Sequence, residues 1–257
     1  MTRDQGGETL DDLLGGRISV LQPEQGHRAG SDAVFLAASV PARASERVLD
    51  AGAGVGVAGL CILVRVADLE VTAVEADGSL CALAASNAAR NGVAARFRVI
   101  EADVAAPAEA LKAKGLMRES YDHVIANPPF HVAGTVRSAP DQGRAFAHVM
   151  GDGALEDWVR FLATMAAPKG FLTLIHRPDS LTDLLKLLER RFGDIAVFPL
   201  FPKRGEPATR VILQGRKGSR AGLRLLPGLA LHEPDGRYTA KAEAVLRGGE
   251  GLELGIR

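Results

Sequence analysis

Short apolar segments alternate with helical segments along most of this chain, and that alternation constrains the fold more than any other feature of the sequence. Strands are predicted at residues 47–51, 70–75, 97–101, 121–126 and 170–176, and helices at residues 56–66, 79–91, 106–114 and 155–166. Apolar strands such as Val48-Leu49-Asp50, separated by helices of this length, favour a parallel sheet with helices on both faces.

The last part of the pattern differs from the rest. Apolar segments at residues 195–201 and 209–214 are separated by residues 202–208, a linker too short for a helical crossover. They predict an antiparallel hairpin that completes a seven-stranded, mostly parallel α/β sheet. Sheets of this kind bind ligands at the carboxyl ends of their strands.

The sequence divides into three parts. Residues 1–40 form an N-terminal extension, in which the polar, glycine-rich residues 1–16 are expected to fray and residues 33–40 to form a helix capped by Ser31 or Asp32. Residues 41–218 form the core of the fold. Residues 219–257 form a C-terminal appendage with a strand, a turn at residues 233–236 and a helix from Thr239.

Composition excludes several classes of protein. No apolar stretch approaches about 20 residues and the first residues are polar, so neither a membrane span nor a signal peptide is expected, and a cytoplasmic location fits. Cys61 and Cys81 are too few for a disulfide framework, and no histidine pair has the spacing of metal ligands, so no metal is expected.

Basic residues are concentrated near the end of the core, although the net charge is zero. Seven of them stand against the single acid Glu206: Lys203, Arg204, Arg210, Arg216, Lys217, Arg220 and Arg224. This segregation indicates either a phosphate-binding patch or an ordinary solvated basic face.

Three successive strand ends carry residues suited to a nucleoside. The first ends in a glycine-rich loop, whose glycines permit tight turns and close approach of a ligand to the backbone. The second ends in Glu75-Ala76, where a carboxylate can accept two ribose hydroxyls. Asp103 after the third can accept an adenine amino group, although it is also a common turn residue. The predicted cofactor-binding residues of the loop are Asp50, Gly52, Ala53, Gly54 and Gly56.

Two adenosine-containing cofactors compete for this site. Gly54, Gly56 and Gly59 match the dinucleotide fingerprint G-x-G-x-x-G, so NAD remains an alternative. Asp50, just before the glycines, favours S-adenosylmethionine, because it can hold the loop or meet the ammonium group of the cofactor. The antiparallel end of the sheet points the same way.

Asn127-Pro128-Pro129-Phe130, directly after the fourth strand, predicts a site for a planar amine. The Asn127 side-chain carbonyl and the Pro128 backbone carbonyl can each accept one N–H of an amino group. The Phe130 ring can stack on the flat system that carries it, and Asn127 also borders the cofactor. A plain proline turn is the structural alternative.

Together these motifs resemble the amino-methyltransferases of the methyltransferase small-domain type. Within that group, the chain is most similar to bacterial tRNA adenine-N6 methyltransferases that act beside the anticodon of a valine tRNA. Gln25–Arg28, Ser31–Ala33 and Tyr238–Ala240 resemble further segments of that family, and the resemblance spans about residues 17–246. It implies a Rossmann-like class I methyltransferase fold, S-adenosylmethionine as cofactor and tRNA as substrate, with Arg28 and Asp32 near the cofactor or acceptor mouth.

The predicted reaction is direct transfer of a methyl group to adenine nitrogen, with no covalent enzyme intermediate. His131 is a candidate proton acceptor or substrate contact, and Lys203 and Arg204 are candidate substrate-side contacts. Three alternatives remain: methylation of a glutamine carboxamide in a release factor, methylation of a small molecule, and a non-catalytic cofactor-binding module. The hairpin edge and the C-terminal helix would permit a homodimer.

Overall fold

The computed structural model describes residues 3–4, 7–25, 28–129 and 154–255. Its main sheet contains the seven predicted strands in the order β6-β5-β4-β7-β8-β10-β9. Their bounds are Phe97–Glu101 (β6), Glu70–Glu75 (β5), Arg47–Ala51 (β4), Tyr121–Ala126 (β7), Ala166–His176 (β8), Arg210–Lys217 (β10) and Phe192–Lys203 (β9). The first five are parallel to one another, and β10 is antiparallel to both of its neighbours, β8 and β9. The predicted hairpin is therefore confirmed.

The prediction of seven strands is wrong in number, because the described part of the sheet has nine. The C-terminal appendage adds β11 (Arg224–Leu225) and β12 (Leu229–His232), and both pair in parallel with β9. Without them, β9 would present a long unpaired edge, which proteins commonly cover. A turn then leads through Thr239, whose side chain accepts the Ala242 N–H, into α7 (Ala240–Leu246).

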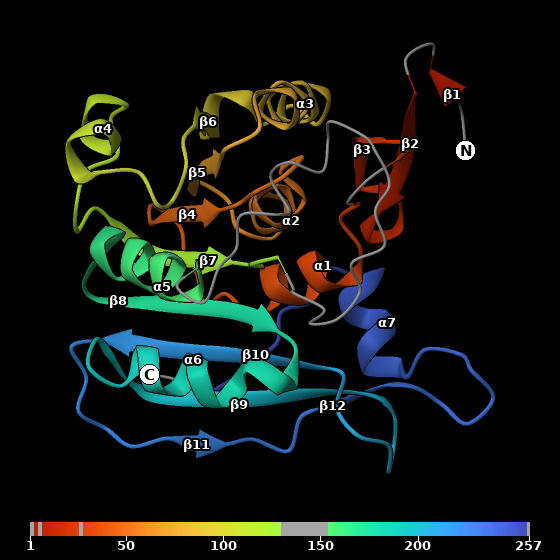
Figure 1. Cartoon of the computed structure of the whole chain (residues 1–257). Coiled ribbons are helices and arrows are strands. Elements are labelled where there is room, and N and C mark those ends of the chain that lie inside the picture. The colour runs from red at the N-terminus through yellow and green to blue at the C-terminus, as the bar shows by residue number, and fades with distance from the viewer. Residues whose placement is uncertain (1–2, 5–6, 26–27, 130–153, 256–257) are drawn as a thin grey trace, which may run out of the picture.

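Helices cover both faces of the sheet (Figure 1). One hydrophobic core lies beneath α1 (Ser31–Ala38), α2 (Val57–Arg65), α3 (Gly78–Arg90) and α7. The other lies beneath α4 (Ala108–Ala113), α5 (Ala154–Met165) and α6 (Leu181–Leu188), the last of which the sequence analysis did not predict. The helix predicted at residues 155–166 ends before Pro168, because Ala166 already pairs with Tyr121 as part of β8. Within the described residues, no helix is long and apolar enough to cross a membrane.

The N-terminal segment forms a second, antiparallel sheet of β1 (Arg3–Asp4), β2 (Glu8–Leu13) and β3 (Ile18–Pro23). The prediction that residues 1–16 fray is therefore wrong for residues 8–13. The sheet is held because Ile18 and Val20 are fully buried in the core that α2 and α3 also line. It lies beside α3 in Figure 1.

The carboxyl ends of β4, β5, β6, β7 and β8 lie along one edge of the main sheet, here called the strand-tip edge (the right-hand edge in Figure 1). β4 and β7 are neighbours, and the final residues Ala51 and Ala126 pair with each other. The glycine-rich loop and the Asn127 motif therefore leave the sheet side by side.

Candidate functional site

Three glycines with positive φ angles shape the loop after β4. The φ angles are 62° at Gly52, 56° at Gly54 and 89° at Gly56, in the left-handed region that favours glycine. A Cβ on Gly52 would overlap the Trp158 ring of α5, and one on Gly56 would lie 2.9 Å from Cζ of Phe97. A Cβ on Gly54 would meet no described atom within 4 Å. The open side of the loop, where a ligand can approach, is therefore at Gly54.

The end of β5 holds this loop through the Glu75 carboxylate and a backbone carbonyl. Glu75, at the end of β5, accepts the Gly54 N–H through Oε2 at 2.9 Å. Its other oxygen accepts the N–H groups of Ala76 at 2.8 Å and Asp77 at 3.1 Å. The Ala53 N–H donates to the carbonyl of Val74 at 3.0 Å, so the second strand fixes the loop at two successive points.

Asp50, at the end of β4, holds the start of α2, which follows the loop. Its side chain is only 2% exposed, and Oδ2 accepts the Gly59 N–H at 3.2 Å. Burial raises the pKa of Asp50 to about 7, against a lowering effect of the Gly59 N–H and with a further increase from the negative charge of Glu75. The predicted role of holding the loop agrees with this geometry.

Both cysteines, Cys61 and Cys81, are buried. Burial raises the pKa of Cys61 to about 12, and the nearby Asp50 carboxyl adds to the increase. Burial likewise raises the pKa of Cys81 to about 11. Both side chains are therefore thiols at neutral pH and do not provide a thiolate nucleophile.

Asp103 follows β6 at the third strand tip. It is exposed, and its Oδ1 accepts the Ala105 N–H at 2.8 Å, so it closes a local turn. Its position agrees with both sequence interpretations, because an exposed carboxylate in a turn can still accept a ligand N–H.

Asn127 carries an unusual polar atom. Its Oδ1 is buried, and within the described part of the chain no hydrogen-bond donor reaches it. Pro128 is buried and Pro129 is exposed, whereas Phe130 and His131 lie outside the described residues. Buried acceptors are nearly always bonded, so this one indicates a position where a donor arrives with a ligand.

The two residues assigned to the cofactor or acceptor mouth by resemblance each have protein partners, and that assignment stays a prediction. Arg28 donates to Thr9 Oγ1 at 2.6 Å and forms an ion pair with Asp11, so it joins the segment before α1 to β2. Asp32 Oδ2 accepts from Arg210 Nε at 2.7 Å. The prediction that Ser31 or Asp32 caps α1 is wrong: the N-cap residue is Gly30, and no side chain caps the helix.

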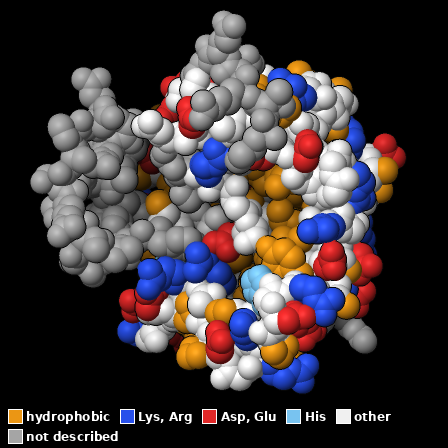
Figure 2. Space-filling view, turned by 90° about the vertical axis from the view of Figure 1, so that its right-hand side faces the viewer, with side chains coloured by type: hydrophobic (Ala, Val, Ile, Leu, Met, Phe, Trp, Pro, Cys, Tyr) orange, Lys and Arg blue, Asp and Glu red, His pale blue; other side chains and the backbone are white. Residues whose placement is uncertain are grey.

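The basic residues near the end of the core do not form a single patch. Because β10 is antiparallel to β8, Lys203, Arg204 and Arg210 lie at the strand-tip edge, while Arg216, Lys217, Arg220 and Arg224 lie toward the opposite edge. Figure 2 looks onto the strand-tip edge and shows hydrophobic side chains at its centre, with basic and acidic side chains interspersed around them. The first group therefore lies at the same edge as Asn127.

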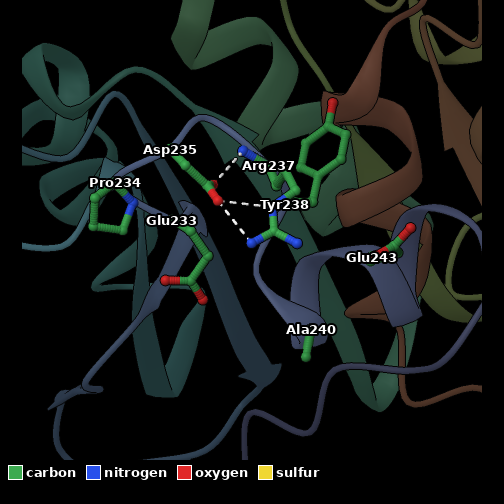
Figure 3. A pocket seen from close by; sticks show the side chains of 7 residues that line it. All are labelled: Glu233, Pro234, Asp235, Arg237, Tyr238, Ala240 and Glu243. Atoms are coloured by element: carbon green, nitrogen blue, oxygen red, sulfur yellow. Dashed lines mark hydrogen bonds and ion pairs between the residues drawn. The ribbon is translucent and has the colours of Figure 1, made fainter.

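A separate, open surface depression lies in the C-terminal appendage (Figure 3). Its walls include Glu233, Glu243 and the paired side chains of Asp235 and Arg237, with Tyr238 beside them. None of its lining residues belongs to the glycine loop or the Asn127 motif, so it is not part of the site at the strand tips.

Comparison with known proteins identifies the family. A family model described as the methyltransferase small domain matches residues 28–143. A predicted O-methyltransferase of known crystal structure from Agrobacterium tumefaciens is 30% identical, with a TM-score of 0.75, and the match covers 88% of this chain and 100% of that one. This chain belongs to the methyltransferase small-domain family.

Two further similar proteins are named for their acceptors. A tRNA1(Val) (adenine(37)-N6)-methyltransferase from Aeromonas hydrophila is 29% identical over 82% of this chain and 85% of that one. A T. thermophilus 16S rRNA N2 methyltransferase, solved in complex with AdoMet and guanosine, is 22% identical with a TM-score of 0.56 over 82% of this chain and 50% of that one, and shows the shared fold.

The small-domain methyltransferase described here is an enzyme that uses S-adenosylmethionine. Its own residues fit that cofactor: a Cβ on Gly54 would meet no described atom within 4 Å, and the Asn127 Oδ1, which has no donor among the described residues, lies at the adjacent strand tip. NAD, the alternative left open by the glycine pattern, is excluded by the family. Trp158, whose ring lies against Gly52, was not among the predicted site residues, because a single tryptophan in a predicted helix carries no signal of a contact with a distant loop.

Proposed function

We propose that this enzyme transfers a methyl group to the exocyclic amino group of adenine in RNA, with tRNA as the substrate. The observation that carries the proposal is the buried Asn127 Oδ1, for which the described residues supply no donor. An amino group donates two hydrogen bonds, and the Asn127 Oδ1 after β7 is a buried acceptor that can receive one of them. A hydroxyl acceptor offers only one hydrogen and would leave one of the two carbonyls of the motif unused.

The adjacent strand tips would hold the two reactants. S-adenosylmethionine supplies the methyl group on a sulfonium centre. The open side of Gly54 receives the cofactor, Glu75 accepts a ribose hydroxyl alongside its bond to Gly54, and Asp103 accepts the adenine amino group of the cofactor. Because Ala51 pairs with Ala126, the loop and Asn127 begin on neighbouring strands. Binding at such neighbouring positions replaces a bimolecular encounter, which is worth up to roughly 7–11 kcal/mol when the geometry is ideal.

Asn127 and Pro128 would orient the acceptor nitrogen. The Asn127 carboxamide oxygen accepts one N–H and the Pro128 carbonyl the other, which directs the lone pair of the nitrogen toward the methyl group. These bonds also draw electron density back to a nitrogen that is otherwise conjugated with the ring. Phe130 stacks on the base, which must first leave its neighbours in the RNA. The nitrogen loses a proton after transfer, so no strong base is required.

RNA as the acceptor is supported by two features. Several relatives of similar length are named as tRNA adenine-N6 methyltransferases. Lys203 and Arg204 lie at the same strand-tip edge as Asn127, where they can contact phosphates.

The proposal is tested by incubating the protein with radiolabelled S-adenosylmethionine and total bacterial RNA, then digesting the RNA to nucleosides. We expect label in N6-methyladenosine, and we expect Asn127→Ala to abolish it. If the wild-type protein binds the cofactor but labels no RNA, adenine in RNA is not the acceptor.

A further inference from the structure

Asn87 on α3 and Asn91, the C-cap residue of that helix, hold the N-terminal sheet by an arrangement that resembles strand pairing. Asn91 Oδ1 accepts the Ser19 N–H at 2.9 Å, and Asn91 Nδ2 donates to the Ser19 carbonyl at 2.8 Å. Asn87 does the same with Leu21, accepting the N–H at 2.8 Å and donating to the carbonyl at 3.0 Å. Each carboxamide thus satisfies both backbone groups of one β3 residue.

The spacing of helix and strand makes this match possible. Residues four apart on a helix are separated by about 6 Å along its axis and face the same side. Residues two apart on a strand are separated by about 6.6–6.8 Å. Since β2 occupies one edge of β3, the two asparagines complete its other edge.

Asn87 makes one contact that Asn91 does not. Its second amide hydrogen is donated to the backbone carbonyl of Val55 at 3.1 Å. The second amide hydrogen of Asn91 goes to the Asn87 carbonyl within α3. The Asn87 side chain is fully buried, so its carboxamide is fixed between β3 on one side and Val55 on the other.

Val55 is the residue between Gly54 and Gly56 in the glycine loop. Glycines on both sides leave the backbone free to adopt many conformations, so the loop depends on external contacts for its position. Glu75 holds the Gly54 N–H at 2.9 Å, and the Ala53 carbonyl holds the Gly56 N–H at 2.9 Å. Asn87 donates to the carbonyl of Val55, which lies between these two glycines in the chain.

We propose that Asn87 is a positioning residue for the cofactor, through which the N-terminal sheet fixes the glycine loop. β3 holds the carboxamide and the carboxamide holds the Val55 carbonyl, so Gly54 is kept in the conformation that leaves its side of the loop open. The inference rests on the proposed placement of the cofactor at this loop. It makes the N-terminal sheet a determinant of cofactor affinity.

The test compares Asn87→Ala with Asn91→Ala. Both variants remove one pair of hydrogen bonds to β3, but only Asn87→Ala releases Val55. Cofactor binding is followed by the fluorescence of Trp158, the single tryptophan, whose ring lies against Gly52. We expect the Kd for S-adenosylmethionine to rise about tenfold in Asn87→Ala, equivalent to about 1.4 kcal/mol, and to change less than about twofold in Asn91→Ala.

Steady-state kinetics separate positioning from general loss of structure. Positioning predicts a higher KM for S-adenosylmethionine in Asn87→Ala with little change in kcat at saturating cofactor. A lower kcat with unchanged KM, or an equal rise of Kd in both asparagine variants, would overturn the proposal.

Glu75→Ala distinguishes a failure of this proposal from a failure of the cofactor placement. This variant should weaken cofactor binding whether or not Asn87 positions the loop. If it leaves the Kd unchanged, the cofactor does not lie at this loop, and the positioning role is rejected with it. If it raises the Kd while Asn87→Ala does not, only the positioning role is rejected.

A measurement on the unaltered protein covers the case in which Asn87→Ala fails to fold. Native-state amide exchange at low denaturant should show Leu21 and the loop residues 54–56 losing protection in one cooperative step. Loss of protection at residues 54–56 while Leu21 remains protected would overturn the proposal.

Discussion

The indole of Trp158 lies directly against the backbone of Gly52, so that a Cβ on Gly52 would overlap Cη2 and lie 3.0 Å from Cζ3. Trp158 belongs to α5, on one face of the sheet, and it is 8% exposed. The first glycine of the loop is therefore required both by its φ angle of 62° and by a close contact. This contact fixes the start of the loop against the helix.

Gly52→Ala should destabilise the protein by roughly 2–4 kcal/mol, because a left-handed residue with a side chain is strained and the added methyl overpacks against Trp158. Urea unfolding followed by circular dichroism measures the change. Gly218→Ala is the matched control: its φ angle is 73° but a Cβ there would meet nothing within 4 Å, so only the backbone strain of about 1–2 kcal/mol is expected. Equal losses in the two variants would show that Trp158 does not restrain the loop.

Gly54→Ala should separate stability from binding. A Cβ at this position has open space around it, so the stability loss should match that of Gly218→Ala. The methyl group would instead occupy the space proposed for the cofactor, and the Kd for S-adenosylmethionine should rise at least tenfold. Isothermal titration measures this. Normal binding by Gly54→Ala would place the cofactor elsewhere.

Asn127→Ala should abolish activity without loss of stability. The variant removes a buried acceptor that has no donor among the described residues, so the free energy of unfolding should be unchanged or higher by about 1 kcal/mol. We expect kcat to fall at least about a hundredfold, as when a hydrogen-bonding group that acts in the transition state is removed. Asn91→Ala, which breaks satisfied hydrogen bonds, should instead lower the melting temperature. Strong destabilisation by Asn127→Ala would mean that its carboxamide is structural.

Asp50 should make the cofactor-free protein less stable as pH rises. Burial raises the pKa of its carboxyl from 3.8 to about 7, so between these values the folded state retains a proton that the unfolded chain has released. The free energy of unfolding therefore decreases from pH 4 to pH 7, by up to about 4 kcal/mol from this group.

Asp50→Asn lacks this titration while keeping an acceptor for the Gly59 N–H, so the difference between its stability and that of the unaltered protein isolates the effect. Burial lowers the pKa of His123 and of His176, and their contributions have the opposite sign. Denaturant unfolding at pH 5, 6, 7 and 8 measures the difference. Parallel curves for the two proteins would contradict the raised pKa.

Arg204→Glu and Arg220→Glu should affect RNA binding differently. Both side chains are exposed, but Arg204 lies at the strand-tip edge and Arg220 follows β10 at the opposite edge. We expect Arg204→Glu to raise the KM for RNA about fivefold and to reduce the salt dependence of binding by about one unit of slope. Arg220→Glu should change neither the KM for RNA nor the salt dependence of binding measurably. Equal effects would indicate an RNA path across both edges.

Much of the fold was predictable because it depends on local signals. The apolar runs at residues 47–51, 70–75, 97–101 and 121–126 became strands with the predicted bounds. The short linker before Thr209 correctly predicted the antiparallel hairpin. By contrast, residues 8–13 looked unstructured because they are mostly polar and follow glycines, and the two asparagines that hold their hairpin partner β3 are distant in sequence.

The candidate site divides in the same way. Sequence alone determined that the glycines, Glu75 and Asn127 stand at the ends of strands, because hydrophobic periodicity fixes where each strand stops; that β4 and β7 are neighbours came from the structure. Only the tertiary structure decided that Arg28 and Asp32 bond to Asp11 and Arg210, that the basic segment is split between two edges, and that Trp158 and Asn87 support the glycine loop. These relationships join residues that are distant along the chain, and a side chain of given type finds its partner only when packing of the sheet and helices has set the distances between them.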